Sequence, residues 1–175
     1  TSEWDSQNAY LRSISTSTTG INRRAFGKHD GFSVRCIKDG IVKVQDADGN
    51  FYNVVKIGNQ VWLAENLKTT KYNDGTSITH ITDNTQWSNA TSGAYCWYMN
   101  DSDTYWEYGA LYNGYAVGTG ILCPSGWHVP SVEEWTTLID FLGGTTVAGA
   151  KLKELGTTHW FNPNTGTNES GFNAL

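Results

Sequence analysis

The sequence predicts an α+β fold with short antiparallel sheets, two or three short helices and long loops. Two apolar runs with a period of two flank an Asp-Gly turn between residues 41 and 63, which is typical of a β-hairpin. A capped amphipathic helix is predicted over residues 131–142. Gly, Ser, Thr and Asn make up more than a third of the chain, and this composition favours turns and loops.

Length and charge narrow the classes of protein that fit. The chain has 175 residues, enough for one domain or two small ones. Its formal net charge of -5 argues against a nucleic-acid partner, because binding phosphates requires a basic surface. No apolar run approaches the roughly 18 residues that a membrane helix needs, so no transmembrane segment is predicted.

The N-terminal 40 residues are predicted to form strands. Apolar residues alternate at Ala9, Leu11 and Ile14, and residues 32–37 form the last strand of this segment. A period of two places one face of such a strand in a core. The hairpin of residues 41–63 follows directly and starts a meander.

The second half of the chain alternates strand and helix signals. Residues 93–100 are predicted to form a buried strand, and residues 106–117 a short helix entering the core. Ser131 and Glu134 have the spacing of a capping box, followed by apolar residues on one helical face and a glycine stop. A further short helix is predicted over residues 148–155.

Neither the histidines nor the acidic residues form a recognisable catalytic motif. His29, His80, His128 and His159 are scattered, and no nucleophile elbow, zinc-protease motif or phosphate loop is present. Glu65 has the chemistry of a general acid, but a carboxylate that caps main-chain amides in a turn explains it more simply. We therefore predict no enzymatic activity and no required cofactor.

Two acidic segments are candidate cation sites, and calcium is the metal that their oxygen ligands favour. Asp46, Asp48 and Asn50 alternate like the start of an EF-hand loop, but the later Glu is missing and turn chemistry is the simpler explanation. Asn100, Asp101 and Asp103 gather oxygen atoms after the predicted strand of residues 93–100, where a cation would hold the long loops or the turn would simply be solvated.

Three longer segments carry a resemblance to a known family: residues 55–67 (VKIGNQVWLAENL), 108–113 (YGALYN) and 122–130 (LCPSGWHVP). Together with shorter matches at 31–36, 133–135 and 169–175, they resemble the Fibrobacter succinogenes major paralogous domain family. The resemblance implies an exported or lipid-anchored protein, chiefly of Bacteroidetes and Fibrobacteres. Residues 126–135 are also similar to part of C-type-lectin-like folds, which implies a domain of that kind.

The order of the segments is rotated relative to the family. Residues 1–40 resemble the closing strands of a family domain, and residues 41–175 resemble its main body. Three explanations fit this order: a circular permutant, a fragment of a tandem array, or a fibre subunit whose first strands complete a neighbour. The first expects these strands in their own chain, whereas the last expects them in the next subunit.

Cysteine usage supports export. Three cysteines without a CxxC pair allow one disulfide and a spare thiol, or three reduced thiols. The resemblance to C-type-lectin-like folds implies a disulfide between Cys36 and Cys123. Cys96 is then left over, and a small buried hydrophobic residue is the simpler interpretation of it than a reactive thiol.

Aromatic residues are the most distinctive feature of the composition. Trp62, Trp127 and Trp135 lie in the family segments and are predicted to pack the core, whereas Trp87, Trp106 and Trp160 lie in polar loops and are the candidates for ligand contact. The sequence thus predicts an extracellular or cell-surface structural or adhesive module, which associates with itself, as in a filament, or with other surface proteins. A glycan-binding module of a surface lipoprotein is the alternative, and an enzyme is a distant third.

Overall fold

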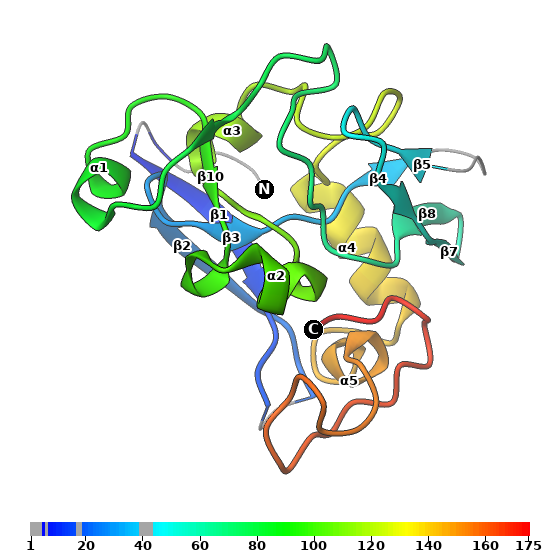
Figure 1. Cartoon of the computed structure of the whole chain (residues 1–175). Helices are drawn as coiled ribbons and strands as arrows, with labels where there is room; N and C mark the ends of the chain where they lie inside the picture. Colours follow the sequence, from blue (N-terminus) through cyan, green and yellow to red (C-terminus); the bar gives the residue numbers. More distant parts are fainter. Residues whose placement is uncertain (1–4, 6, 17–18, 39–43) are drawn as a thin grey trace.

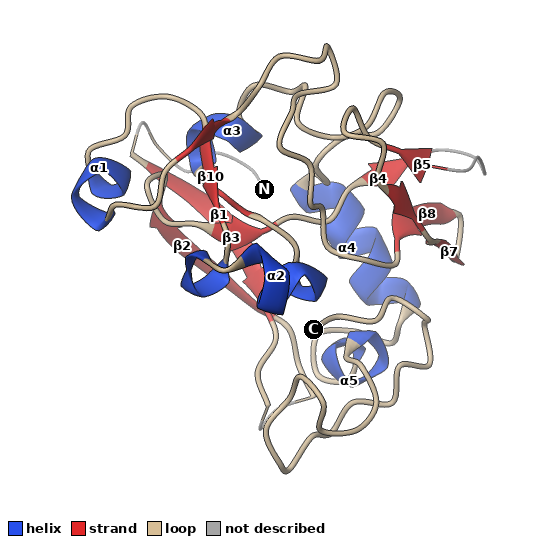
Figure 2. Cartoon of the chain, in the orientation of Figure 1, coloured by secondary structure: helices blue, strands red, loops and turns tan. Residues whose placement is uncertain are grey.

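The computed structural model describes residues 5, 7–16, 19–38 and 44–175, and it confirms the α+β class. Short strands form one four-stranded sheet, one three-stranded sheet and two hairpins, and long loops join them to short helices (Figures 1 and 2). The longest helix, α4 (Val132–Phe141), runs through the middle of the molecule in Figure 1. That the domain is C-type-lectin-like stays a prediction.

The N-terminal strands confirm the β prediction, but they are divided among three sheets. β1 (Asn8–Ser13) and β2 (Asn22–Gly27) form an antiparallel hairpin. β3 (Phe32–Ser33) and β4 (Ile37–Lys38) are separate edge strands of two other sheets, so the expected continuous strand over residues 32–37 is interrupted. The interruption arises because the segment crosses from one sheet to the other, with Cys36 accepting a main-chain hydrogen bond from Leu63.

The predicted hairpin of residues 41–63 is in fact two hairpins. β5 (Val44–Gln45) pairs with β6 (Phe51–Tyr52), and β7 (Val54–Ile57) pairs with β8 (Gln60–Leu63). Gly58 makes the second turn with a φ of 60°, a conformation that favours glycine. The start of the predicted hairpin at residues 41–43 and the predicted boundary between residues 40 and 41 lie outside the described residues.

The segment between the hairpins and α4 is mostly loop. Its regular elements are β9 (Thr79–His80), α1 (Asn84–Ser88), β10 (Ala94–Cys96), the 3-10 helix η1 (Tyr98–Asn100), α2 (Ser102–Tyr105), the 3-10 helix η2 (Trp106–Tyr108), β11 (Leu111–Tyr112) and α3 (Gly114–Val117). The predicted strand over residues 93–100 is thus only three residues long, because Met99 and Asn100 take positive φ angles. The prediction of one helix over residues 106–117 is wrong, because η2 and α3 occupy only the two ends of this range and β11 lies between them.

Gly109 explains why no helix spans residues 106–117. Its φ is 71°, and a Cβ atom there would lie 2.6 Å from the main-chain oxygen of Leu67. The next residue, Ala110, donates a main-chain hydrogen bond of 2.9 Å to that same oxygen. The chain is therefore drawn against the loop that follows β8, and β11 joins β10 and β3 in the four-stranded sheet.

The helix signals after residue 130 are confirmed. Ser131 and Glu134 form both hydrogen bonds of the capping box at the start of α4. The second helix, α5 (Ala148–Leu152), is shorter than predicted. It ends there because Lys153 becomes extended and pairs with Ala174 in a parallel bridge.

The core has two parts, and the segment of residues 34–37 contributes to both. The first part includes Val34, Cys36, Val61, Leu67, Tyr112, Leu122, Cys123 and Trp127, and the second includes Ile37, Trp62, Leu138, Ile139, Leu152 and Phe172. Trp62 and Trp127 are buried and Trp135 packs against the second part, so the prediction that these three tryptophans pack the core is confirmed. Figure 1 shows the loops after α5 grouped at one end of the molecule.

Candidate functional site

Tyrosine rings from three consecutive short elements gather on one surface. The ring centre of Tyr98 lies 5.1 Å from that of Tyr105 and 5.9 Å from that of Tyr108. Tyr108 in turn meets the imidazole of His159 edge to face, with 5.2 Å between ring centres. These rings come from η1, α2 and η2 and from a loop near the C-terminus, so only the folded chain brings them together.

A cavity of about 390 Å³ opens beside these rings, and we call it the aromatic cleft. Phe161 is 86% exposed and Tyr98 is 49% exposed, so large apolar surfaces face solvent at this cleft. Monomeric proteins usually keep such apolar patches small unless they bind something. The cleft is lined by Ser33, Tyr98, Tyr108, Leu111, Thr157, Thr158, His159, Trp160 and Phe161.

His159 lies between two carboxylates at the edge of the aromatic cleft. Its Nδ1 is 2.8 Å from Oε2 of Glu154, and its Nε2 is 3.1 Å from Oε2 of Glu107. The imidazole is largely buried, whereas the Glu107 side chain is 60% exposed. The bridge therefore ties η2 to the C-terminal loop and leaves a carboxylate at the surface.

The wall formed by Trp160 is fixed by hydrogen bonds. The Trp160 indole donates a bond of 2.9 Å to the main-chain oxygen of Ala174. The side chain of Asn164 donates to the main-chain oxygens of Glu154 and Gly156, which closes the loop that carries Trp160. On the opposite wall, Asn66 donates a bond of 2.8 Å to the main-chain oxygen of Tyr108.

Of the three tryptophans predicted to contact a ligand, the structure brings only Trp160 to the aromatic cleft. Trp106 is exposed and lies outside the cleft lining, and the Lys68 ammonium lies over one face of its ring, 4.0 Å from the centre, in a cation–π contact. Trp87 is half-buried and lines a separate shallow pocket beside Gly31. Whether any of the three contacts a ligand stays a prediction.

Of the candidate calcium ligands after the strand, Asp101 caps a helix and Asp103 lies within that helix. Asp101 Oδ1 accepts main-chain hydrogen bonds from Asp103 and Thr104 at the start of α2. Its bonds with the side chain and main chain of Thr104 lower the pKa of the Asp101 carboxyl below 3.8. Asn100 donates its amide to the main-chain oxygen of Thr82. Within the described ranges, no three His, Cys, Asp or Glu side chains lie where they would hold a metal, and calcium stays a prediction.

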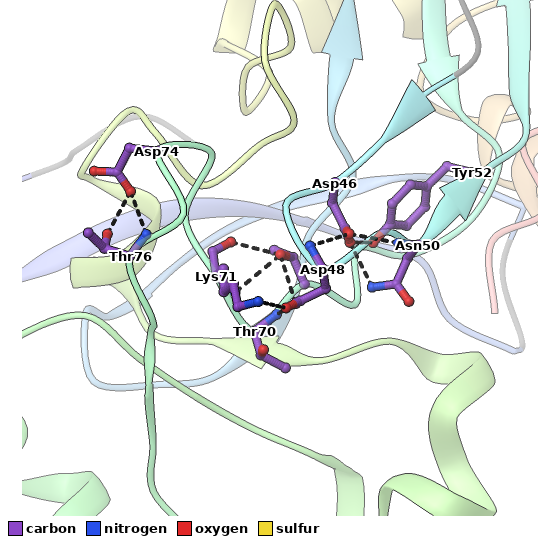
Figure 3. Close-up of polar contacts among 9 residues, drawn as sticks. Asp46, Asp48, Asn50, Tyr52, Thr70, Lys71, Asp74 and Thr76 are labelled. Carbon is purple, nitrogen blue, oxygen red and sulfur yellow. Dashed lines mark hydrogen bonds and ion pairs between the residues drawn. The ribbon is translucent and has the colours of Figure 1, made fainter.

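The second acidic segment supports the interpretation as turn chemistry (Figure 3). Asp46 accepts hydrogen bonds from the main-chain amides of Asp48 and Asn50 and from the Tyr52 hydroxyl. Asp48 accepts a main-chain hydrogen bond from Thr70 and forms an ion pair of 3.3 Å with Lys71. Burial acts to raise the pKa of Asp48, but these contacts outweigh it and the pKa lies below 3.8. The turn is thus tied to the loop after β8.

The acidic residues at the other predicted positions also have structural partners. Glu65 accepts hydrogen bonds from the main chain and side chain of Asn53 and pairs with Lys68, as expected for a carboxylate that caps main-chain amides. Two histidines have carboxylate partners that the sequence analysis does not predict. His128 contacts Glu134 at 2.7 Å, and Glu107 reaches His159 across 52 positions. His128 and Glu134 are only six positions apart, so their proximity is visible in the sequence.

The disulfide implied by the resemblance is confirmed. Cys36 and Cys123 are bonded and buried, and they close a loop over a separation of 87 positions. Cys96 is a free, half-buried thiol, and burial raises its pKa above the usual value. Because stable disulfides form in oxidising compartments, the bond fits an extracellular location.

One family of known proteins matches most of the chain. In the described part of the chain, no helix is both long and apolar enough to cross a membrane. No curated protein and no solved structure matches the chain. The Fibrobacter succinogenes major domain matches residues 55–175, which begin within β7 and include α4, Cys123 and most of the aromatic cleft. The chain therefore belongs to the Fibrobacter succinogenes major domain family.

Proposed function

We propose that the chain is an exported surface module that adheres to an external ligand through the aromatic cleft. The family and the buried disulfide support a surface-associated protein, because the bond of Cys36 with Cys123 suits an oxidising environment. Adhesion requires a rigid surface with exposed anchors, and the cleft offers both.

One observation carries the proposal: exposed aromatic side chains surround a cavity whose walls are held by hydrogen bonds. Phe161 and Tyr98 leave apolar area in water, which gains nothing for the stability of the isolated chain. Binding sites use such aromatic anchors because they bury much area with few rotatable bonds. The anchored wall at Trp160 reduces the loop entropy that a partner would have to overcome.

Substitution at Phe161 tests adhesion directly. Labelled protein is incubated with microcrystalline cellulose, xylan, peptidoglycan and collagen, and saturable retention is measured. We expect at least one surface to retain the protein, and Phe161→Ala to weaken retention by about tenfold, the loss of one anchor of about 1.4 kcal/mol. Phe51→Ala is the matched control, because Phe51 is 64% exposed on β6 outside the cleft lining.

Two results would overturn the adhesive function. Either no surface retains the protein, or Phe161→Ala and Phe51→Ala weaken retention equally. Equal thermal unfolding midpoints for both variants ensure that a loss of retention reflects a loss of contact.

A self-assembling filament subunit is the second candidate function. The observation in its favour is that β3 and β4 are both edge strands, each completing a sheet whose other strands come from later in the chain. Edge strands of this kind can be supplied by a neighbouring copy in strand-exchange assemblies. Analytical sedimentation at increasing concentration tests it, because a filament subunit forms large species whereas a permuted monomer does not.

A further inference from the structure

We infer that the aromatic cleft binds a neutral saccharide, and that Glu107 selects against acidic ones. The inference rests on the proposed adhesive function of the same cleft.

The shape and the rings of the aromatic cleft suit a sugar. Its volume of about 390 Å³ falls within the range of about 300–1,000 Å³ that is typical of small-molecule sites. Pyranose rings have an apolar face of C–H groups, and flat aromatic side chains such as Phe161 and Tyr98 offer a surface against which that face packs. A short oligosaccharide would cover both rings.

Polar groups at the aromatic cleft match the hydroxyl groups of a sugar. Ser33, Thr157 and Thr158 line it, and each hydroxyl both donates and accepts hydrogen bonds. Glu107 is not itself a lining residue, but its exposed carboxylate contacts the lining His159 through Oε2, and Oε1 forms no hydrogen bond with any residue that the structure describes. An ionised carboxylate only accepts, so it fits a ligand that is rich in O–H donors.

The charges around the aromatic cleft argue against an acidic ligand. Two carboxylates, Glu107 and Glu154, flank the single imidazole of His159 at the edge of the cleft. The ammonium of Lys153 lies 5.5 Å from the centre of the Trp160 ring, but the Lys153 side chain is fully buried and donates to the main-chain oxygen of Ser15 and to the Thr165 hydroxyl. No lysine or arginine belongs to the residues that line the cleft. A uronate would therefore meet the two carboxylates without a lysine or arginine side chain to bind it.

The test compares neutral and acidic oligosaccharides in solution. Binding of cellohexaose, laminarihexaose, mannohexaose and hexagalacturonate is measured by calorimetry and by tryptophan fluorescence. We expect at least one neutral hexasaccharide to bind at least tenfold more tightly than hexagalacturonate. Phe161→Ala and Tyr98→Ala should weaken that binding by about tenfold each, and Phe51→Ala by less than twofold.

Replacing Glu107 tests the specificity. Glu107→Gln keeps the shape of the side chain but removes its charge. It should weaken binding of the neutral sugar several-fold and reduce the difference in affinity between the neutral sugar and hexagalacturonate. Glu107→Lys should reverse the preference. If Glu107 has only a structural role, its replacement should instead weaken binding of both sugars equally and lower the thermal unfolding midpoint. That result would overturn the assignment of Glu107 to specificity.

The outcomes separate this inference from the adhesive function. If the protein adheres through Phe161 but no neutral hexasaccharide binds or competes, the ligand is of another class, such as a protein, and the inference is wrong while adhesion stands. Equal binding of the acidic and neutral sugars would also overturn the inference. Absence of both adhesion and sugar binding would overturn both proposals.

Discussion

Arg35 donates a hydrogen bond of 2.6 Å from Nη1 to the main-chain oxygen of Phe172, which lies 137 positions further along the chain. The guanidinium also lies over the Phe172 ring, 4.7 Å from its centre, and donates to the main-chain oxygen of Asn173. Its remaining bonds reach Asn66 and the main-chain oxygen of Leu63. One buried side chain thus joins the segment between β3 and β4 to the loop after β8 and to the C-terminal residues.

Arg35→Met should lower the free energy of unfolding by about 3 kcal/mol or more, because it leaves buried carbonyl oxygens without donors. Arg35→Lys should retain only part of the stability, since an ammonium cannot reach the same four acceptors in one plane. Urea unfolding measures the loss, and Arg24→Lys on the exposed part of β2 serves as the control. An unfolding free energy unchanged by Arg35→Met would show that this bridge does not stabilise the fold.

The disulfide gives a second prediction. A bond that closes a loop over 87 positions stabilises a chain by about 4 kcal/mol in the chain-entropy description. Paired replacement of Cys36 and Cys123 by Ala should therefore lower the free energy of unfolding by about that amount. Cys96→Ala is the control and should change it little, because Cys96 forms no disulfide. Equal effects of the two replacements would argue against the stabilising role of the bond.

Asp48 gives a prediction for pH. Its pKa in the folded chain lies below 3.8, so near that pH the unfolded chain binds more protons than the folded one. The stability that Asp48 contributes is therefore present above pH 3.8 and is lost as the pH falls through the lower folded value. Denaturant unfolding at pH 7 and pH 3 should show a smaller difference for Asp48→Asn than for the unchanged chain. A difference of the same size would contradict the role of the Thr70 and Lys71 contacts.

The capping box of α4 should contribute less to the free energy of unfolding than Arg35 or the disulfide. Ser131→Ala removes the acceptor for the Glu134 amide and should lower the free energy of unfolding by about 1 kcal/mol. Ser131→Thr keeps a hydroxyl at the same position and should lose much less. Guanidinium unfolding of the two variants distinguishes the cap from the packing of α4, because the packed face of the helix is the same in both.

How far the sequence predicts this fold depends on where each partner lies in the chain. Ser131 and Glu134 are three positions apart, so their signal is local and α4 is found correctly. Residues 106–117 resemble a helix locally, but Gly109 and Ala110 meet Leu67, which is more than forty positions away. Tertiary contacts of that kind override local preference and leave no periodic pattern to detect.

The candidate site shows the same limit. Trp160 is a candidate because it lies in a polar loop, and the disulfide is predicted by the resemblance to C-type-lectin-like folds. Phe161, Tyr98 and the bridge of Glu107 with His159 gave no signal, since their significance arises only when η1, η2 and the loop after α5 meet. Trp106 is a candidate by the same reasoning as Trp160, yet it does not line the cleft and the Lys68 ammonium lies over one face of its ring.

Adhesion through the aromatic cleft is tested most directly by hydrogen–deuterium exchange, measured for the protein free in solution and bound to the surface that retains it. We expect binding to slow exchange in residues 97–108 and 157–161, which carry the aromatic cleft, and to leave exchange in β6 and in the β1–β2 hairpin unchanged. Slowed exchange confined to β1, β2 or β6, with no change at the cleft, would contradict the claim that this cleft is where the protein adheres.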